Sequence, residues 1–351
     1  MMTDNRLHHL LSSFPTRRII VVGDYFLDKY LECDPRLAEV SLETGKTAHQ
    51  VVNVRHSPGA GGAVVSNLVS LGAGEVIPVG FTGDDGEGYD LRKDIAALGC
   101  STDYLQCVSE RRTPTYLKPR DIAIPGLDGE AERYDTKNRE PLPEHVERGV
   151  VASLDELLPR ADAVIIADQV EEDRCGAITC SVREQIARMA GDFPNVIFWA
   201  DSRRRIGLFR NVIIKPNQRE AVRAAFPGSE SPLTDEMVVK AGHELRLRTG
   251  KPVFITRSER GILVFDEAGC TEIPGVRVER PIDPTGAGDS ATAAAVLTLC
   301  SGGTSAEAAL LANLVASITI QQLSVTGTAK PEDLPARLGM WASSFSLEGE
   351  G

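Results

Sequence analysis

Short β-branched runs that end in Gly, Asp or Asn alternate along this chain with longer stretches of helical periodicity. The runs are RIIVVGD, EVIPVGFTGDD, AVIIAD, VIFWAD, VIIKPN, PVFITR and GILVF. This alternation predicts an α/β fold with a doubly wound, mostly parallel sheet and helices on both faces. Ligands of such sheets bind beyond the carboxyl ends of the strands. We therefore expect one rim to present the polar residues that follow the strands, namely Asp24, Asp84, Asp168, Asp201 and Asn217.

Two segments interrupt this alternation, at approximately residues 29–56 and 111–136. Polar and apolar residues alternate in them, as in HQVVNVRH and TPTYLKPRDIAI, and neither contains a convincing helix. They are predicted to form a small β-lid over the rim. Because no repeat, low-complexity tract or long linker divides the chain, we expect a single domain over residues 1–351 with the lid inserted in it.

Composition excludes several classes of function. A formal net charge of -12 disfavours nucleic acid as a partner. Seven scattered cysteines without a C-x-x-C pair favour reduced thiols and a cytoplasmic location, and the dispersed histidines do not suggest a zinc site. The N-terminal stretch predicts a short amphipathic helix and not a signal peptide, and the most apolar late segments are too short to span a membrane.

The segment DPTGAGDS, from Asp283 to Ser290, precedes the alanine-rich run ATAAAVL. Residues Gly286, Ala287 and Gly288 are predicted to form a tight loop into a helix, whose first N–H groups lack partners and attract anions. Glycine permits close approach and positive φ. Asp289 would then accept a proton from a hydroxyl that attacks a phosphate, with a pKa that the helix terminus keeps low.

Other interpretations of this segment remain open at this point. Asp289 could be only an N-cap and the glycines only a turn, because both residue types are favoured there. GAGDSA also satisfies a dinucleotide-binding pattern with Glu307 as its acid, although Pro281 and Pro284 interrupt the approach. A Walker A loop is excluded, because no G-K-[ST] follows the glycines.

DPTGAGDS resembles the C-terminal signature of the PfkB, or ribokinase-like, family of carbohydrate kinases. The segments VVGDYFLDKY, PGAGGAVVSNLVSLGA and KPNQRE resemble further motifs of that family, so the resemblance covers nearly the whole chain. FITRSERGILVF, DPTGAGDS and LANLVASITIQQLSVTGT together look closest to the kinase module of bacterial heptose-phosphate kinase/adenylyltransferase proteins.

The resemblance implies a role for each matching residue. Asp289 would be the catalytic base, and the amides of Gly286, Ala287 and Gly288 would form an anion hole. The sugar would be bound by Asp28, Gly59, Gly61, Gly62 and Asn67, and the charge of the predicted lid adds Lys118, Arg120 and Arg133 to the substrate-binding residues. ATP would be bound by Asn217, Glu220, Thr256, Ser258, Gly261 and Asn313. Glu220 would also hold Mg²⁺, and Asp283 and Thr285 a monovalent cation such as K⁺. The resemblance also implies a homodimer formed through the lid.

The sequence departs from the family pattern in three places. RLAEVSLETGKTAHQ replaces a proline-rich lid strand, the asparagine after the glycine pair is missing with Asn67 nearly a turn late, and QVEED replaces a Tyr-x-Lys-Gly element. All three fall on the acceptor side, so the reaction class is better supported than the substrate.

The resulting hypothesis is an ATP-dependent, magnesium-requiring kinase that phosphorylates a hydroxyl of a small sugar or sugar phosphate, including a heptose-phosphate-type acceptor. A nucleoside kinase of the same family and a non-catalytic sugar-binding regulator are the alternatives, with a nicotinamide dehydrogenase last. Cations cluster in this acidic chain at Lys118, Arg120 and Arg133 of the lid and at Arg203 to Arg205 after a strand. This clustering predicts that the acceptor already carries a phosphate or another anionic group.

Overall fold

A nine-stranded sheet forms the centre of the computed structural model, which describes residues 2–228, 232–323 and 325–346. Its strand order is β15-β14-β13-β12-β11-β10-β1-β6-β7. The strands are β1 (Arg18–Gly23), β6 (Glu75–Gly83), β7 (Leu105–Val108), β10 (Ala163–Asp168), β11 (Ile197–Ser202), β12 (Ile213–Ile214), β13 (Val253–Thr256), β14 (Ile262–Asp266) and β15 (Gly269–Ile273). From β7 to β13 every neighbouring pair is parallel, whereas β13 with β14 and β14 with β15 pair antiparallel. This arrangement confirms the predicted α/β class.

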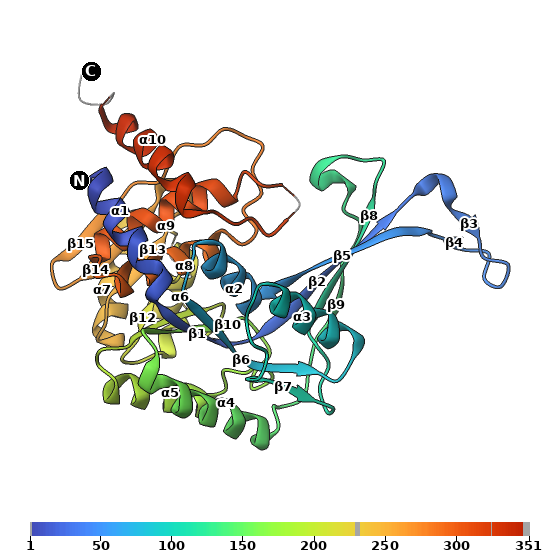
Figure 1. Ribbon diagram of the computed structural model, residues 1–351, viewed down its shortest axis with the longest axis horizontal. Coiled ribbons are helices and arrows are strands. Elements are labelled where there is room, and N and C mark those ends of the chain that lie inside the picture. The colour runs from blue at the N-terminus through green and yellow to red at the C-terminus, as the bar shows by residue number, and fades with distance from the viewer. Residues whose placement is uncertain (1, 229–231, 324, 347–351) are drawn as a thin grey trace.

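Helices cover both faces of this sheet (Figure 1). One face packs against α1 (Asp4–Ser13), α2 (Gly61–Ser70), α3 (Gly86–Ala97), α8 (Ala287–Cys300), α9 (Ser305–Thr319) and α10 (Leu334–Ser346). The other packs against α4 (Glu144–Leu157), α5 (Cys180–Asp192), α6 (Gln218–Ala225) and α7 (Asp235–Thr249). Short 3-10 helices lie at Phe14–Thr16, Pro35–Leu37, Gly126–Gly129, Leu158–Arg160, Ile206–Leu208, Ser258–Arg260 and Pro331–Asp333.

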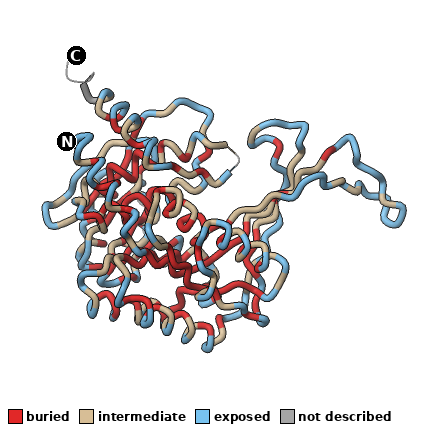
Figure 2. The backbone as a smooth tube through the Cα atoms, in the orientation of Figure 1, coloured by how far each residue is buried: buried red, intermediate tan, exposed pale blue. Residues whose placement is uncertain are grey.

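Strand β1 shows why the strands read as continuous apolar runs. Successive side chains of a strand point to opposite faces, and Ile19 and Val21 join one core cluster while Ile20 and Val22 join the other. Since helices cover both faces, every one of these four positions is buried. Figure 2 shows this buried core concentrated in the body of the molecule.

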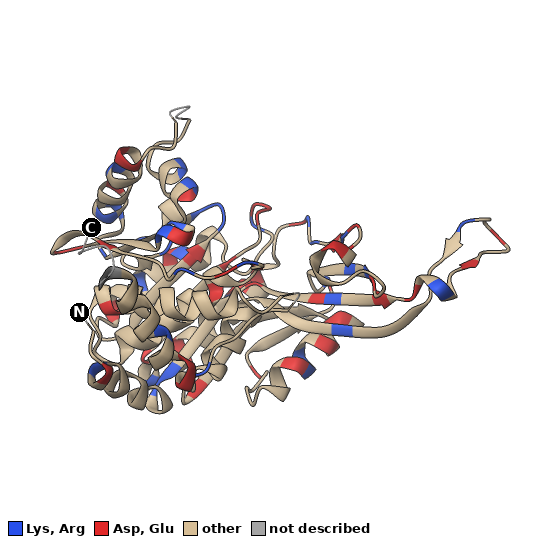
Figure 3. Ribbon diagram, turned by 90° about the horizontal axis from the view of Figure 1, so that it is seen from above, with Lys and Arg blue, Asp and Glu red and all other residues tan. Residues whose placement is uncertain are grey.

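A second sheet projects from the body as the lid (Figures 1 and 3). Its order is β5-β2-β8-β9, and its strands are β2 (Tyr25–Cys33), β5 (Val51–Ala60), β8 (Thr115–Asp121) and β9 (Tyr134–Thr136). A small hairpin, β3 (Glu39–Val40) with β4 (Thr47–Ala48), lies at its far end. The lid strands begin at Tyr25, directly after β1, so the lid and the central sheet share one continuous stretch of chain.

The N-terminal segment forms the predicted helix, α1, which buries Leu7, Leu10 and Leu11. Within the described ranges, none of the helices has both the length and the apolar character that a membrane crossing requires.

Candidate active site

The first turn of α8 lies at the carboxyl edge of the central sheet. Gly286 is its N-cap with φ 76°, in the left-handed region that favours glycine. The helix begins at Ala287, so Gly288 and Asp289 already belong to the first turn. In the described part of the chain, the amides of Gly288 and Asp289 donate to no protein acceptor, whereas that of Ala287 donates to the Pro284 carbonyl. This turn, residues 286–289, therefore offers free N–H groups to an anion, and we call it the α8 cradle.

Asp289 is not the N-cap of this helix, and its carboxylate receives no hydrogen bond from any described residue. Burial and, after it, the charge of Asp201 raise its pKa to about 7, against the opposing charges of Lys215 and Arg203. The expectation that the helix terminus keeps this pKa low is therefore wrong, because desolvation and a neighbouring carboxylate outweigh the dipole. A pKa near the operating pH suits a general base.

A cavity of about 270 Å³, which we call the acceptor cavity after the predicted position of the acceptor, opens between the lid and Asp289. Its wall includes Asp28, Gly59, Lys118, Arg133, Arg203, Asp283, Thr285 and Gly286, together with the aromatic rings of Phe26, Tyr30 and Tyr116. A cavity of this size, with a few polar groups on its wall, can hold a sugar-sized ligand.

Two of the cations in this cavity already have acidic partners. The Lys118 ammonium lies 2.8 Å from the Asp28 carboxylate and 3.2 Å from the Tyr30 hydroxyl. Burial alone would lower the pKa of Lys118, but Asp28 holds it above its ordinary value. Arg133 stacks 4.1 Å over the Tyr116 ring and donates to both oxygens of Asp135.

Arg203 differs from these two cations. Its Nε donates to the neutral amide oxygen of Gln169 at 2.9 Å, and none of the described carboxylates lies within ion-pair distance of it. Arg204 and Arg205 instead pair with Glu171 and Asp168. Of the three consecutive arginines, only Arg203 lines the cavity.

Arg120, predicted to bind the sugar, is not among the residues that line this cavity. Its guanidinium donates to the Gly126 carbonyl at 2.9 Å, within the lid. Lys118 and Arg120 are two residues apart and so point to the same face of β8; the difference comes from their positions along a strand that runs outward from the body.

Three further residues that the resemblance assigns to the sugar are packing residues of α2. Gly61 donates its amide to the Asp24 carbonyl, and a Cβ on Gly62 would collide with Pro58. Asn67 is fully buried and donates to the Ala63 carbonyl. None of the three lines the cavity, whereas a Cβ on Gly59 would lie 2.6 Å from the Asp28 carboxylate.

Among the residues expected at the rim, Asp24 and Asp168 are buried supports instead. Asp24 accepts hydrogen bonds from the amides of Gln169, Val170 and Ala177. Asp168 accepts from the Ser202 hydroxyl and pairs with Arg205. Together they fix the loop that follows β10.

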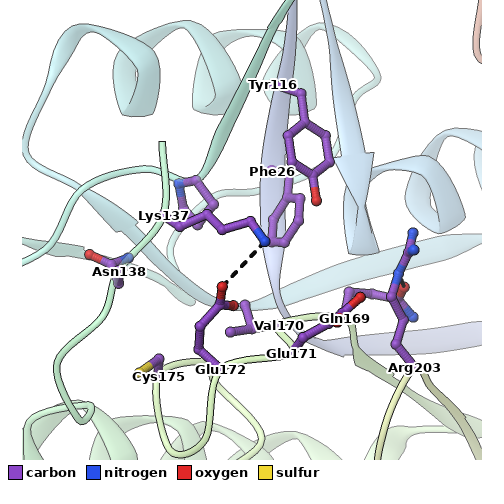
Figure 4. A pocket seen from close by; sticks show the side chains of 11 residues that line it. Phe26, Tyr116, Lys137, Asn138, Gln169, Val170, Glu171, Glu172, Cys175 and Arg203 are labelled. Carbon is purple, nitrogen blue, oxygen red and sulfur yellow. Dashed lines mark hydrogen bonds and ion pairs between the residues drawn. The ribbon is translucent and has the colours of Figure 1, made fainter. Parts of the chain in front are cut away.

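That loop forms a side pocket next to the acceptor cavity (Figure 4). Phe26 and Tyr116 meet edge to face at 5.3 Å above it, and Lys137 pairs with Glu172 across it at 3.2 Å. The QVEED segment that departs from the family pattern contributes Gln169, Val170, Glu171 and Glu172 to the wall of this pocket.

A second cavity, of about 500 Å³, lies on the other side of Pro284 and Ala287. Ser258 and Asn313 line it, and its surface is mainly apolar. Asn313 donates to the carbonyls of Ile273 and Pro274, so it shapes the wall. Its volume and apolar lining suit a purine base. Thr256 and Gly261 do not line it; a Cβ on Gly261 would meet the backbone of the neighbouring strand.

Asn217 and Glu220 form a capping box at the start of α6. The Asn217 side chain accepts from the Glu220 amide at 2.9 Å, and the Glu220 carboxylate accepts from the Asn217 amide at 2.8 Å. Burial raises the pKa of Glu220, and Asp201 raises it further against the Asn217 and Lys215 contacts. Over the described residues, no three His, Cys, Asp or Glu side chains are grouped to hold a metal ion.

Asp283 is buried and lies beside the acceptor cavity. Its carboxylate accepts the amide of Thr285 at 3.0 Å. The pair that the resemblance assigns to a monovalent cation is therefore held in one compact turn directly before the α8 cradle.

Sequence reasoning missed Lys215. This lysine follows β12, its side chain is 6% exposed, and its ammonium lies 2.7 Å from the Asp201 carboxylate. A lysine directly after an apolar strand and before the Pro-Asn turn was the available signal, because strand ends face ligands in such sheets.

Comparison with known proteins agrees with this arrangement. Residues 26–332 match the pfkB family carbohydrate kinase. The chain is 31% identical to the bifunctional protein HldE of Wolinella succinogenes over 91% of this chain and 64% of that protein, and 30% identical to HldE of Hyphomonas neptunium over 96% and 66%. It thus spans slightly less than two thirds of these relatives.

Solved structures show the same fold. Arabidopsis thaliana ribokinase, complexed with ribose and ATP, superposes with a TM-score of 0.68 at 19% identity over 92% of this chain and 98% of that one. Phosphofructokinase-2 from Escherichia coli, in complex with substrates and products, gives 0.66 at 18% identity over 93% and 99%. With the ribokinase-like architecture, the cradle at α8 and the match over residues 26–332, the chain belongs to the pfkB family and is a carbohydrate kinase.

Proposed function

We propose that this protein transfers the terminal phosphoryl group of ATP to a hydroxyl of a sugar that already carries an anionic group, such as a heptose phosphate. The observation that supports the transfer is the position of Asp289, on the α8 turn where the two cavities meet, with a pKa of about 7. There it can take the proton of an acceptor hydroxyl while free amides face the phosphoryl group.

Charge supports the anionic acceptor. In the acceptor cavity Lys118 and Arg133 have carboxylate partners, while Arg203 has only an amide. A cation without a counterion beside a cavity attracts an anionic ligand. A charge-assisted hydrogen bond contributes roughly 1.5–3 kcal/mol, which corresponds to a preference of about 10–100-fold for a sugar phosphate over the free sugar.

Glu220 is the proposed Mg²⁺ ligand. Its single carboxylate at the start of α6 fits an ion that keeps most of its waters and takes its other ligands from phosphates. The compact Asp283–Thr285 turn fits the monovalent cation. When bound, these ions would supply positive charge to the phosphates.

Dimer formation through the lid is also part of the proposal. The lid exposes large apolar side chains, among them Val40 at 70% and Leu42 at 102% of their full accessible surface. Such exposure on a projecting sheet favours association with a second copy. We further propose one kinase domain over residues 1–351, acting in the cytoplasm.

The test measures kcat/KM by ADP release for matched free and phosphorylated hexoses and heptoses and for nucleosides. We expect the phosphorylated sugars to be preferred, and Arg203→Gln to reduce that preference about 10–100-fold. Arg120→Gln is the matched control, because its guanidinium lies outside the cavity. If kcat/KM is higher for a free sugar, the protein is a simple sugar kinase. If it is higher for a nucleoside, the protein is a nucleoside kinase. Binding of a sugar without turnover would identify a regulator.

A further inference from the structure

Lys215 is a buried cation at this site, and the proposed reaction assigns it no role. Its ammonium lies beneath the first turn of α8, paired with Asp201 at 2.7 Å. Burial lowers the pKa of a lysine, but Asp201 and, after it, Asp289 and Glu220 raise that of Lys215 above its ordinary value. Lys215 is therefore a charged ammonium in the midst of three carboxylates.

The central sheet fixes the position of this pair. Strands β11 and β12 are parallel neighbours, with Ala200 opposite Ile214, and the Lys215 amide donates to the Ala200 carbonyl at 3.0 Å. Asp201 and Lys215 are the next residues of the two strands, so they emerge side by side at the carboxyl edge. Their placement depends on backbone pairing and not on a mobile loop.

Gly288 leaves the pair open toward the cradle. A Cβ at this position would lie 3.4 Å from the Lys215 ammonium and 4.0 Å from the Asp201 carboxylate. The glycine therefore faces the ion pair directly. Because the Gly288 amide also has no protein acceptor, an anion at this turn would meet a backbone donor and the ammonium together.

We propose that Lys215, held in place by Asp201, binds the phosphoryl group that is transferred, from beneath the first turn of α8. The inference rests on the proposed kinase reaction. In that reaction Asp289 takes the proton of the acceptor hydroxyl, the hydroxyl oxygen forms a bond to the γ-phosphorus, and the bond from that phosphorus to the bridging oxygen breaks, with its electron pair leaving on ADP. Lys215 keeps its proton and offsets the negative charge on the γ-oxygens.

A purely structural ion pair would behave differently. Removing one partner of a buried pair leaves the other charge uncompensated and destabilises the fold. The loss of such a structural pair would weaken the binding of every ligand of the site alike. A contact to the γ-phosphoryl group instead weakens only ligands that carry this group.

The first experiment measures binding by calorimetry for Lys215→Met, with Lys240→Met as the matched control. Lys240 is an exposed lysine of α7 that pairs with Glu236, and it lines neither of the two cavities. The probes are a non-hydrolysable ATP analogue, ADP and adenosine. We expect Lys215→Met to lower the affinity for the analogue about 10–100-fold, to lower that for ADP much less and to leave that for adenosine unchanged. Equal weakening of all three probes, or of none, would overturn the proposal.

The second experiment needs no nucleotide. The charged groups that face Asp289 are Asp201, Lys215, Arg203 and Asp28. Titrating the carboxyl carbon of Asp289 by NMR should show its pKa rising in Lys215→Met and falling in Asp201→Asn. Unchanged titration in both variants would mean that the pair does not face the transfer site, and would overturn the proposal.

Two controls keep the outcomes separate. If Lys215→Met fails to fold, Lys215→Arg retains the charge and should keep the discrimination between the analogue and ADP; equal affinities for the two in a folded Lys215→Arg protein would count against the proposal. If wild-type protein binds the analogue but turns over no sugar, the proposed function fails, while the binding and titration results still decide the role of Lys215.

Discussion

Lowering the pH from 8 to 6 should protonate Asp289 and slow phosphoryl transfer. Its pKa lies at about 7, because burial and the Asp201 charge disfavour the carboxylate. At pH 8 about nine tenths of the Asp289 carboxyl groups are then ionised and at pH 6 slightly less than one tenth, so kcat should fall roughly tenfold. An unperturbed aspartate, with its ordinary pKa of 3.8, would be ionised at both pH values and would give a flat profile.

The same shift has a consequence for stability. The pKa is 3.8 in the unfolded chain and about 7 in the folded one, so the folded state holds this proton more tightly. Above about pH 4, ionisation of Asp289 therefore costs folding free energy, and the cost grows until about pH 7. Three pKa units at about 1.4 kcal/mol each give an upper limit of about 4 kcal/mol, which partial solvent exposure reduces. Asp289→Asn should thus raise the melting temperature at pH 8, and the gain should vanish below about pH 4.

Both effects can be measured on the same preparations. Turnover is followed by ADP release from pH 5.5 to 8.5 at saturating substrates and fixed ionic strength, and melting by calorimetry. Asp103→Asn, at an exposed position, should change neither quantity. Turnover of Asp289→Asn should fall on the order of 10²–10⁴-fold. A pH-independent wild-type kcat, or an Asp289→Asn protein that is less stable than wild type at pH 8, would refute this reasoning.

Two further substitutions test the phosphate side. Glu220→Gln should raise the magnesium requirement much more than the acceptor KM, because Mg²⁺ depends on few carboxylates. A magnesium titration that overlays that of wild type would leave Glu220 only a helix-capping role, which stabilises the fold by up to about 1 kcal/mol. Gly286→Ala forces a Cβ into φ 76°, so it should lower the free energy of unfolding by roughly 1–2 kcal/mol and also lower kcat. Unchanged urea unfolding together with unchanged kcat would contradict the role of that glycine.

The fold could be predicted because its signal is local and periodic. Strands such as AVIIAD, buried at all six positions, have the apolar continuity that only a sheet covered on both faces explains. The cradle was predictable for a similar reason. Residues 286 to 289 are contiguous, so loop, helix start and acid can be read from one segment without knowing what packs around it.

Properties that depend on distant residues could not be predicted in this way. The pKa of Asp289 depends on Asp201 and Lys215, which come from β11 and from the end of β12. Likewise, the sequence could not tell which of the arginines at 120 and 203 lines the cavity in front of Asp289, because that depends on where the folded chain places each residue. Asn67 shows a third case, in which a polar residue near a binding motif turns into the core.

Negative charge gathers around Asp289. The site places Asp289 near the carboxylates of Asp201 and Asp28, and the phosphates of a nucleotide would add more negative charge. Lys215 and Arg203 are the cations that oppose this accumulation, one beneath the α8 turn and one in the acceptor cavity. The same two cations therefore stabilise both the ionised base and the bound phosphates. By linkage, bound phosphates raise the pKa of Asp289 by the same free energy by which ionisation of Asp289 weakens phosphate binding. The helix dipole alone would favour both, but it is too small to offset burial, so the ionised base depends on side chains that the surrounding strands and loops supply.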